Sequence, residues 1–271
     1  MDETHDHLVI ERREAPLVLS MPHGGTELPP SIASRLTSDG LAVADTDWWM
    51  DRLYDFAADL GATVVRTTLS RYVIDVNRDP SGASLYPGQA TTELCPLQTF
   101  DGVPIYRPGE TPDDAEIAER RAVYFEAYHQ ALARELARLK ARHGYAILYD
   151  CHSIRSVVPR LFPGRLPVFN IGTNSGLSCA PGFETAAVEA FASDRNFDHV
   201  LNGRFKGGWI TRHYGQPASG VHAIQLELAQ RAYMDETPPW RFDAAKADRL
   251  RPTLRHVLGA VLGWAQSTRG A

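Results

Sequence analysis

Residues with the chemistry of a hydrolytic metal site follow apolar runs at several points in this chain. His23 follows the run at residues 16–21, His152 follows the run at 145–149, and Glu227 lies near the end of the run at 221–228. Two histidines and one carboxylate are the protein ligands of a catalytic zinc that keeps its fourth position open for water. A second carboxylate that does not bind the metal is needed to take a proton from that water. These residue types predict a metal-dependent hydrolase, although each polar group also suits a turn that caps a buried strand.

Arginines provide the second chemical signal. The segment RYVIDVNR, residues 71–78, holds Arg71, Asp75, Asn77 and Arg78 within eight positions, and we expect it to form a short strand. Guanidinium groups match carboxylates with a two-pronged geometry, so this segment predicts an anion-binding edge. An ion pair within the segment is the alternative interpretation.

Alternating strand and helix patterns give the expected frame for these residues. Each short apolar run is bounded by glycine, proline or polar residues, as is typical of strands buried on both faces. The alternation predicts an α/β fold of one domain, residues 1–271, with a mixed, mostly parallel central sheet and helices on both faces. Ligands bind at the carboxyl ends of the strands in such sheets. The expected strands are 16–21, 62–66, 71–78, 145–149, 167–172, 199–201 and 221–228, and the expected helices are 48–60, 111–142, 183–193 and 243–265.

Two segments fall outside this pattern. Residues 80–111 are rich in glycine, proline, threonine and serine and predict a long irregular excursion of the kind that forms binding loops. Residues 202–215 combine four glycines with several cations and predict a polar loop over the site.

Composition narrows the class of protein. The 271 residues carry a net charge of −5 with no basic block, which argues against a nucleic-acid partner. The three cysteines, Cys95, Cys151 and Cys179, are widely separated, so we expect no disulfide framework. No stretch approaches the ~20 apolar residues of a membrane span, and the charged N-terminus is unlike a signal peptide. These features predict a cytoplasmic enzyme with no membrane partner.

Six motifs together support a family resemblance. SMPHGG, DTDWW, SRYVIDVNR, YDCHSIRS, NGRFKGGWITRHYG and HAIQLELAQ occur in that order and span residues 20–230. In these six motifs the chain resembles the N-formylglutamate amidohydrolase (N-formylglutamate deformylase) family. That family is similar in fold to zinc carboxypeptidases and aspartoacylases. The resemblance implies a zinc-exopeptidase-like (phosphorylase/hydrolase-like) fold. It also implies release of formate and L-glutamate from N-formyl-L-glutamate, the last step in one route of histidine degradation.

The resemblance also implies metal ligands. One zinc per chain would be bound by His23, Asp47 and His152, although manganese, cobalt or iron suit similar ligands. The zinc carboxypeptidases and aspartoacylases place the acidic ligand three residues after the first histidine, where this chain has Thr26. Asp47 therefore has rivals, which are Glu27, Asp45 and Asp51.

Further roles follow from the same resemblance. Glu227 would be the general base, Arg71 would polarise the carbonyl, and Asn77 with Arg78 would bind one carboxylate of a dicarboxylate substrate. The candidates for the second carboxylate are Arg155, Arg204 and Arg212.

Several other polar residues have structural interpretations. We expect Asp150 to orient a ligand or to cap a turn, Asp75 to pair with Arg71 or Arg78, and Cys151 to be buried. His129, His213 and His222 are expected to be structural.

Three alternative functions remain open at this stage. They are a deacylase of another N-acyl amino acid, a metallophosphoesterase and a carboxylate-binding module without catalysis. The sequence gives no prediction of oligomeric state.

Overall fold

The computed structural model describes residues 6–84, 88 and 91–267 and contains a seven-stranded mixed sheet. The strand order is β1-β3-β2-β4-β7-β5-β6. The pairs β2–β3, β2–β4, β4–β7 and β5–β6 are parallel, whereas β1–β3 and β5–β7 are antiparallel. The prediction of a mixed, mostly parallel sheet is therefore confirmed. The strands are β1 (Leu8–Glu11), β2 (Leu17–Met21), β3 (Thr63–Thr67), β4 (Ala146–Ile154), β5 (Phe169–Gly172), β6 (His199–Leu201) and β7 (Val221–Ala229).

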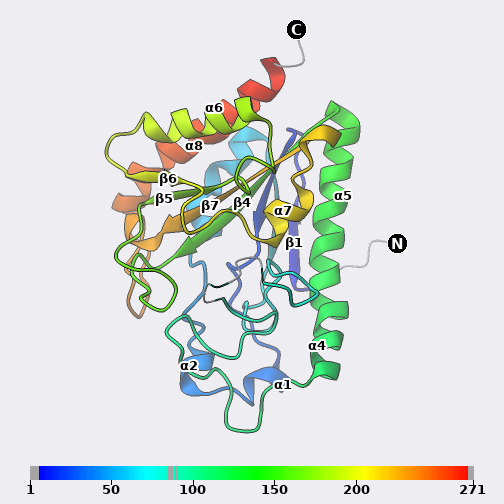
Figure 1. Cartoon of the computed structure of the whole chain (residues 1–271), viewed down its shortest axis with the longest axis vertical. Coiled ribbons are helices and arrows are strands. Elements are labelled where there is room, and N and C mark those ends of the chain that lie inside the picture. Colours follow the sequence, from blue (N-terminus) through cyan, green and yellow to red (C-terminus); the bar gives the residue numbers. More distant parts are fainter. Residues whose placement is uncertain (1–5, 85–87, 89–90, 268–271) are drawn as a thin grey trace.

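Helices cover both faces of this sheet, as the strand patterns predicted. Because side chains alternate along a strand, Leu17 and Leu19 of β2 join one apolar cluster and Val18 joins the other. The first cluster includes residues of α6 (Pro181–Ala192) and α8 (Ala244–Ser267), and the second includes residues of α5 (Glu126–His143). Figure 1 shows α5 along one side of the sheet, with α6 and α8 together on the other.

The long helix expected at 111–142 is present as a continuous helical run. Asp113 caps it by accepting a hydrogen bond from the Glu116 backbone, and Gly144 ends it in the left-handed conformation that glycine adopts readily. The run consists of α4 (Asp114–Arg120), a π-helical turn η2 (Arg121–Phe125) and α5. The remaining helical elements are α1 (Pro30–Ala33), α2 (Ser38–Leu41), α3 (Met50–Leu53), η1 (Asp55–Leu60), α7 (Trp209–Tyr214), η3 (Pro217–Ser219) and η4 (Gln230–Ala232).

The prediction of a strand at 71–78 was wrong. The segment forms buried turns, in which the Val73 amide bonds to the Ser70 carbonyl and the Arg78 amide bonds to the Asp75 carbonyl. The Asp75 carboxylate also accepts a hydrogen bond from the Asn77 amide at 2.9 Å. Such local hydrogen bonds from side chain to backbone compete with the pairing of strands. They favour turns over a strand in this segment.

Two other expected elements differ in extent. Residues 48–60 are not one helix, because Trp49 takes a left-handed conformation with φ 62° and the chain continues as the short α3 followed by the 3₁₀ turn η1. The polar segment 202–215 contains the helix α7.

Residues 80–111 lack regular helices and strands throughout the part that the structure describes, as predicted; residues 85–87 and 89–90 lie outside it. The free cysteines Cys95, Cys151 and Cys179 are buried. None of the described helices is long and apolar enough to cross a membrane.

Candidate active site

Three buried side chains place their donor atoms close enough to hold one metal ion. His23 lies just after β2, His152 lies in β4, and Asp47 lies in the loop before α3. One ligand atom from each lies within 4.8 Å of the others. The Asp47 carboxylate stands between the two rings, with Oδ2 3.0 Å from His152 Nδ1 and 3.7 Å from His23 Nδ1. The ring centroids are 4.9 Å apart.

The other nitrogen of each imidazole has a carboxylate partner of its own. His23 Nε2 lies 2.7 Å from Asp75 Oδ1, and His152 Nε2 lies 3.0 Å from Asp150 Oδ2. Metal-binding histidines commonly donate their second N–H to a carboxylate, which fixes the tautomer and the ring orientation. With protons on both Nε2 atoms, each Nδ1 offers a lone pair next to Asp47.

The electrostatics of this cluster fit a bound cation. His23 Nδ1 is buried and has no hydrogen-bond partner among the described residues. Burial, and then the charge of Arg71, lower the pKa of His23 and favour the neutral ring that binds metals. Burial also acts to lower the pKa of His152, but Asp150 and Asp47 raise it well above its ordinary value. The carboxylates that favour a protonated His152 would equally favour a metal cation beside it.

Glu227 is the carboxylate placed next to this cluster. It lies in β7, in register with His152 on the neighbouring parallel strand, and it is buried. Burial raises the pKa of Glu227 to about 8, opposed by the charges of His152 and Arg71 and reinforced by that of Asp47. A carboxyl group with a pKa near neutrality is suited to exchange protons at physiological pH.

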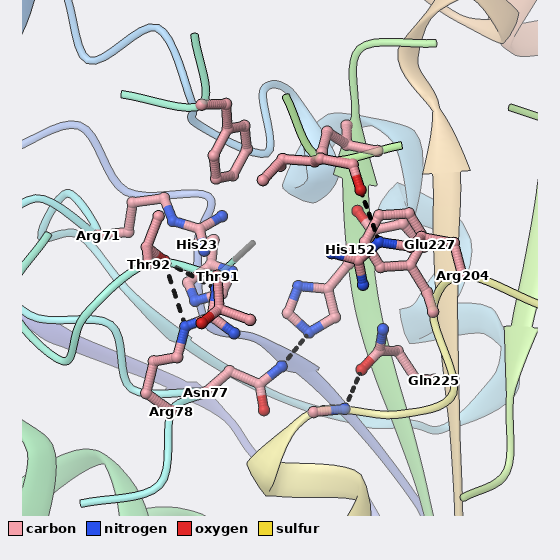
Figure 2. A pocket seen from close by; sticks show the side chains of 15 residues that line it. His23, Arg71, Asn77, Arg78, Thr91, Thr92, His152, Arg204, Gln225 and Glu227 are labelled. Carbon is pink, nitrogen blue, oxygen red and sulfur yellow. Dashed lines mark hydrogen bonds between the residues drawn. The ribbon is translucent and has the colours of Figure 1, made fainter. Parts of the chain in front are cut away.

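A cavity opens in front of these groups, and three arginines line it. Figure 2 shows His152 at its centre, with Arg71 and Arg78 toward one side of the view and Glu227 and Arg204 toward the other. The Arg71 guanidinium donates to Asp75 Oδ2 at 2.6 Å and lies over the Phe100 ring, 4.8 Å from its centroid. The lining residues are His23, Arg71, Asn77, Arg78, Thr91, Thr92, Phe100, His152, Ile154, Leu161, Arg204, Phe205, Gly208, Gln225 and Glu227.

Comparison with known proteins identifies the family. The family profile described as N-formylglutamate amidohydrolase matches residues 15–234. The chain is 49% identical over 266 residues to an N-formylglutamate deformylase of Pseudomonas aeruginosa, with 98% of each chain covered. The chain belongs to the N-formylglutamate amidohydrolase family. The resemblance carried by the six motifs is therefore confirmed.

Other relatives agree with this assignment. An N-formylglutamate deformylase of Pseudomonas putida is 46% identical over 249 residues, covering 92% of this chain and 93% of the relative. The fold matches a crystal structure of an N-formylglutamate amidohydrolase from Ralstonia eutropha JMP134. That match has a TM-score of 0.77 at 23% identity and covers 98% of this chain and 99% of the other. The α/β fold is thus shared with a solved structure whose sequence has diverged widely.

The structure of this N-formylglutamate amidohydrolase family member brings most of the predicted site residues to one place. His23, Asp47 and His152 cluster, and Glu227 and Arg71 lie at the same cavity. Asp75 pairs with both Arg71 and Arg78, at 2.6 and 3.4 Å, and also with His23.

The three acidic residues that were alternatives to Asp47 form hydrogen bonds outside the cluster. Asp45 accepts hydrogen bonds from the Tyr72 hydroxyl at 2.8 Å and the Phe100 amide at 2.7 Å. Glu27 is exposed and accepts from Thr68, and Asp51 is exposed and accepts from the Arg52 amide. Each rival thus has its own protein partner outside the cluster.

Two residues that were predicted to bind the substrate, Arg155 and Arg212, do not line the cavity. Arg155 donates to Asp101 at 2.8 Å, and Arg212 donates to the Gly207 carbonyl at 2.8 Å; neither is among the residues that line the cavity. Of the three arginines considered for the second carboxylate, only Arg204 lines it. Arg155 directly follows β4 and Arg212 lies within α7, and the sequence pattern does not fix where either side chain points.

Asn77 lines the cavity, but its amide is already engaged. Its Oδ1 accepts from the Ile210 backbone amide at 2.8 Å, and its Nδ2 donates to Asp150 Oδ2 at 3.4 Å, beside His152. These contacts connect α7 to the candidate metal-binding cluster of His23, Asp47 and His152. They favour a role in positioning His152 over direct contact with a substrate carboxylate.

The three histidines that were expected to be structural make contacts with other protein groups. His129 is buried and contacts the Val76 carbonyl and the Tyr214 hydroxyl, while His222 accepts from the Ala180 amide. His213 stacks on Trp209 away from the cavity.

Several lining residues were missed by sequence reasoning. Gln225 lies two positions before Glu227 in the same strand, so the period of two could have placed it on the same face. Thr91, Thr92 and Phe100 come from the irregular excursion, which has no periodic signal that could have found them.

Proposed function

We propose that this protein hydrolyses N-formyl-L-glutamate to formate and L-glutamate with one zinc ion bound by His23, Asp47 and His152. The observation that carries the proposal is the buried set of two imidazoles and one carboxylate, placed beside Glu227 at a cavity with three arginines. The names of the Pseudomonas relatives supply the substrate.

The residues that would hold the ion are pre-positioned by their neighbours. Asp75 and Asp150 fix the two imidazole rings, so little ordering is needed when a metal binds. When bound, a divalent cation here would supply Lewis acidity, which polarises a carbonyl and lowers the pKa of water. Zinc suits the two-nitrogen, one-oxygen donor set and leaves a fourth position open.

Glu227 moves the proton in this scheme. Its carboxylate accepts a proton from the water that attacks the formyl carbon, and it then donates that proton to the amide nitrogen as the carbon–nitrogen bond breaks. Both transfers need a pKa near the working pH, and the pKa of about 8 is in that range. The positive charge of Arg71 lowers the pKa of Glu227 and favours the ionised form that starts the reaction.

The three arginines of the cavity would each interact with a different negatively charged group of the substrate. Arg71, buried beside Asp47 and held by Asp75, would stabilise the developing charge on the formyl oxygen. Arg78 and Arg204, which line the same cavity, would each bind one carboxylate of the substrate. Thr92 holds Arg78 in place by accepting from its guanidinium at 2.8 Å.

Formate release tests the proposal directly. Metal-analysed protein is assayed with N-formyl-L-glutamate before and after removal of metal with a chelator, and again after zinc is restored. We expect about one zinc per chain and activity that follows the zinc content. N-acetyl-L-glutamate is the matched substrate control, because it adds one methyl group at the scissile carbonyl. Full activity in metal-free protein, or preference for the acetyl compound, would contradict the proposal.

The biological setting is a further part of the proposal. On the resemblance of its motifs we assign the enzyme to histidine degradation in the cytoplasm. A strain that lacks it should accumulate N-formylglutamate when histidine is supplied as the nitrogen source, and unchanged levels would refute the assignment.

A further inference from the structure

A second, larger hollow lies apart from the candidate active site and shares none of its lining residues. It has a volume of about 1010 Å³. The segment of residues 155–166 reaches both places, since Leu161 lines the active-site cavity and Arg165 lines the hollow. The start of β5, the turn between α6 and β6, η4 and the first turns of α8 form the rest of its wall.

The wall of the hollow is strongly basic, although the protein as a whole is acidic. Five of its ten lining residues are cations and one is an acid, Asp198, while the whole chain has a net charge of −5. The cations are Arg165, Arg195, Arg231, Lys246 and Arg249. A concave surface lined by one sign of charge concentrates ligands of the opposite sign.

Neighbouring carboxylates compensate only part of this charge. Asp198 lies 3.6 Å from Arg231, and Lys246 lies 3.8 Å from Asp235 and 3.6 Å from Asp243. Within the described part of the chain, Arg165, Arg195 and Arg249 have no carboxylate oxygen within 4.0 Å. Three guanidinium groups therefore line the hollow without an ion-pair partner among the described residues.

Arg231 carries the most specific signal. Its Nη1 nitrogen is buried and has no hydrogen-bond partner among the residues that the structure describes. Burial lowers the pKa of Arg231, and the positive charge of Arg165 lowers it further. A buried donor without an acceptor, next to a second guanidinium, costs free energy that a bound anion would recover.

We propose that this hollow binds a small polyanion with two or more adjacent oxyanion groups, of the class of oligophosphates and polycarboxylates. Guanidinium groups bind phosphate and carboxylate oxygens in pairs, so several arginines around one space select for clustered oxyanions over a single charge. The hollow shares no lining residue with the candidate active site, so a ligand bound there would leave the active-site cavity open.

Calorimetric titration of the metal-loaded protein tests this site at fixed ionic strength. The probes are tripolyphosphate and citrate, which distinguish the two sources of clustered oxyanions, and inorganic phosphate as the single-group control. We expect saturable binding of at least one of the two polyanions at one site per chain. We expect inorganic phosphate to bind at least tenfold more weakly.

Two double variants locate the binding. R195Q/R249Q changes two exposed arginines of the hollow, and R134Q/R142Q removes the same charge from exposed positions on α5. We expect at least tenfold weaker binding in the first variant and unchanged binding in the second, with formate release unchanged in both. The single variant R165Q provides a second check within the hollow.

Three results would overturn the inference. They are no saturable binding of either polyanion, equal affinity for inorganic phosphate, and binding that survives in R195Q/R249Q. The last result would indicate chelation of the active-site metal, since polyphosphates bind metals. Failure of the proposed deformylase activity would leave this test unaffected, because binding is measured without turnover and the variants change no residue of the candidate active site.

Discussion

Replacement of Glu227 by glutamine should abolish turnover and at the same time stabilise the metal-free protein. Glutamine has nearly the same shape as a protonated glutamate but cannot accept or donate the catalytic proton. General acid–base catalysis contributes typically ~10²–10⁴-fold to rate, which corresponds to about 3–5 kcal/mol of activation free energy. We therefore expect formate release to fall by that factor while the zinc content stays near one per chain.

The stability change follows from the pKa of Glu227. Folding raises this pKa from 4.5 to about 8, mainly because the carboxylate loses its hydration on burial. Below pH 4.5 Glu227 is protonated in both the folded and unfolded states, so its ionisation does not change the free energy of unfolding. Between pH 4.5 and 8 the unfolded state releases its proton first, so the free energy of unfolding falls as pH rises. At 1.36 kcal/mol per unit the full effect above pH 8 is roughly 5 kcal/mol, an upper limit because Glu227 also interacts with His152.

Denaturant unfolding of metal-free protein at pH 5 and pH 8.5 measures this effect. The difference in unfolding free energy between E227Q and the unsubstituted protein should be small at pH 5 and several kcal/mol in favour of E227Q at pH 8.5. E110Q is the matched control, because Glu110 is exposed and the same chemical change there should alter neither activity nor stability. Near-normal turnover in E227Q would refute the role as base, and an equal stability difference at both pH values would refute the burial argument.

Three further predictions concern the metal and the substrate. H152A should lose both zinc and activity by metal analysis and formate assay, whereas H199A, at the exposed start of β6, should retain both. D75N should weaken zinc affinity by about 10–100-fold in a competitive chelator titration, because His23 loses its carboxylate partner; unchanged affinity would contradict that role. R204Q should raise the KM for N-formyl-L-glutamate by roughly 10–100-fold, the cost of a charge-assisted hydrogen bond. R155Q should leave it unchanged, because Arg155 pairs with Asp101 outside the cavity.

The buried charges favour the binding of a cation by this cluster. Asp47, Asp75, Asp150 and Glu227 are all buried near one another, and Arg71 is the buried cation beside them. Four buried carboxyl groups beside one buried guanidinium leave negative charge uncompensated, which is costly. The rise in the pKa of Glu227, caused mainly by burial, is one sign of that cost. A divalent ion would lower the cost for the whole group, so we expect metal binding and folding stability to be linked.

The sequence by itself determined the class of the protein and the identity of its central residues. Short apolar runs separated by helical patterns were enough to predict a mostly parallel sheet covered on both faces, because burial on both faces leaves its mark on consecutive residues. The six ordered motifs identified the family, and His23, His152 and Glu227 were candidates because each lies at or after the end of an apolar run. In the structure, His152 and Glu227 occupy paired positions of adjacent strands, which the period of two along each strand does not reveal.

Only the tertiary structure decided how the remaining polar residues are used. The pattern of residues 71–78 predicted a strand, yet the Asp75 carboxylate bonds to the Asn77 backbone amide, Arg71 and Arg78, and the segment forms buried turns. The same carboxylate also contacts His23. Asp45 and Asp47 were equivalent in sequence, and only the fold gives one to Tyr72 and the other to the histidines. The physical reason is that the local sequence pattern indicates which residues are buried and whether they repeat as in a strand or a helix. The partner of a charged side chain is instead set by contacts between segments far apart in the chain.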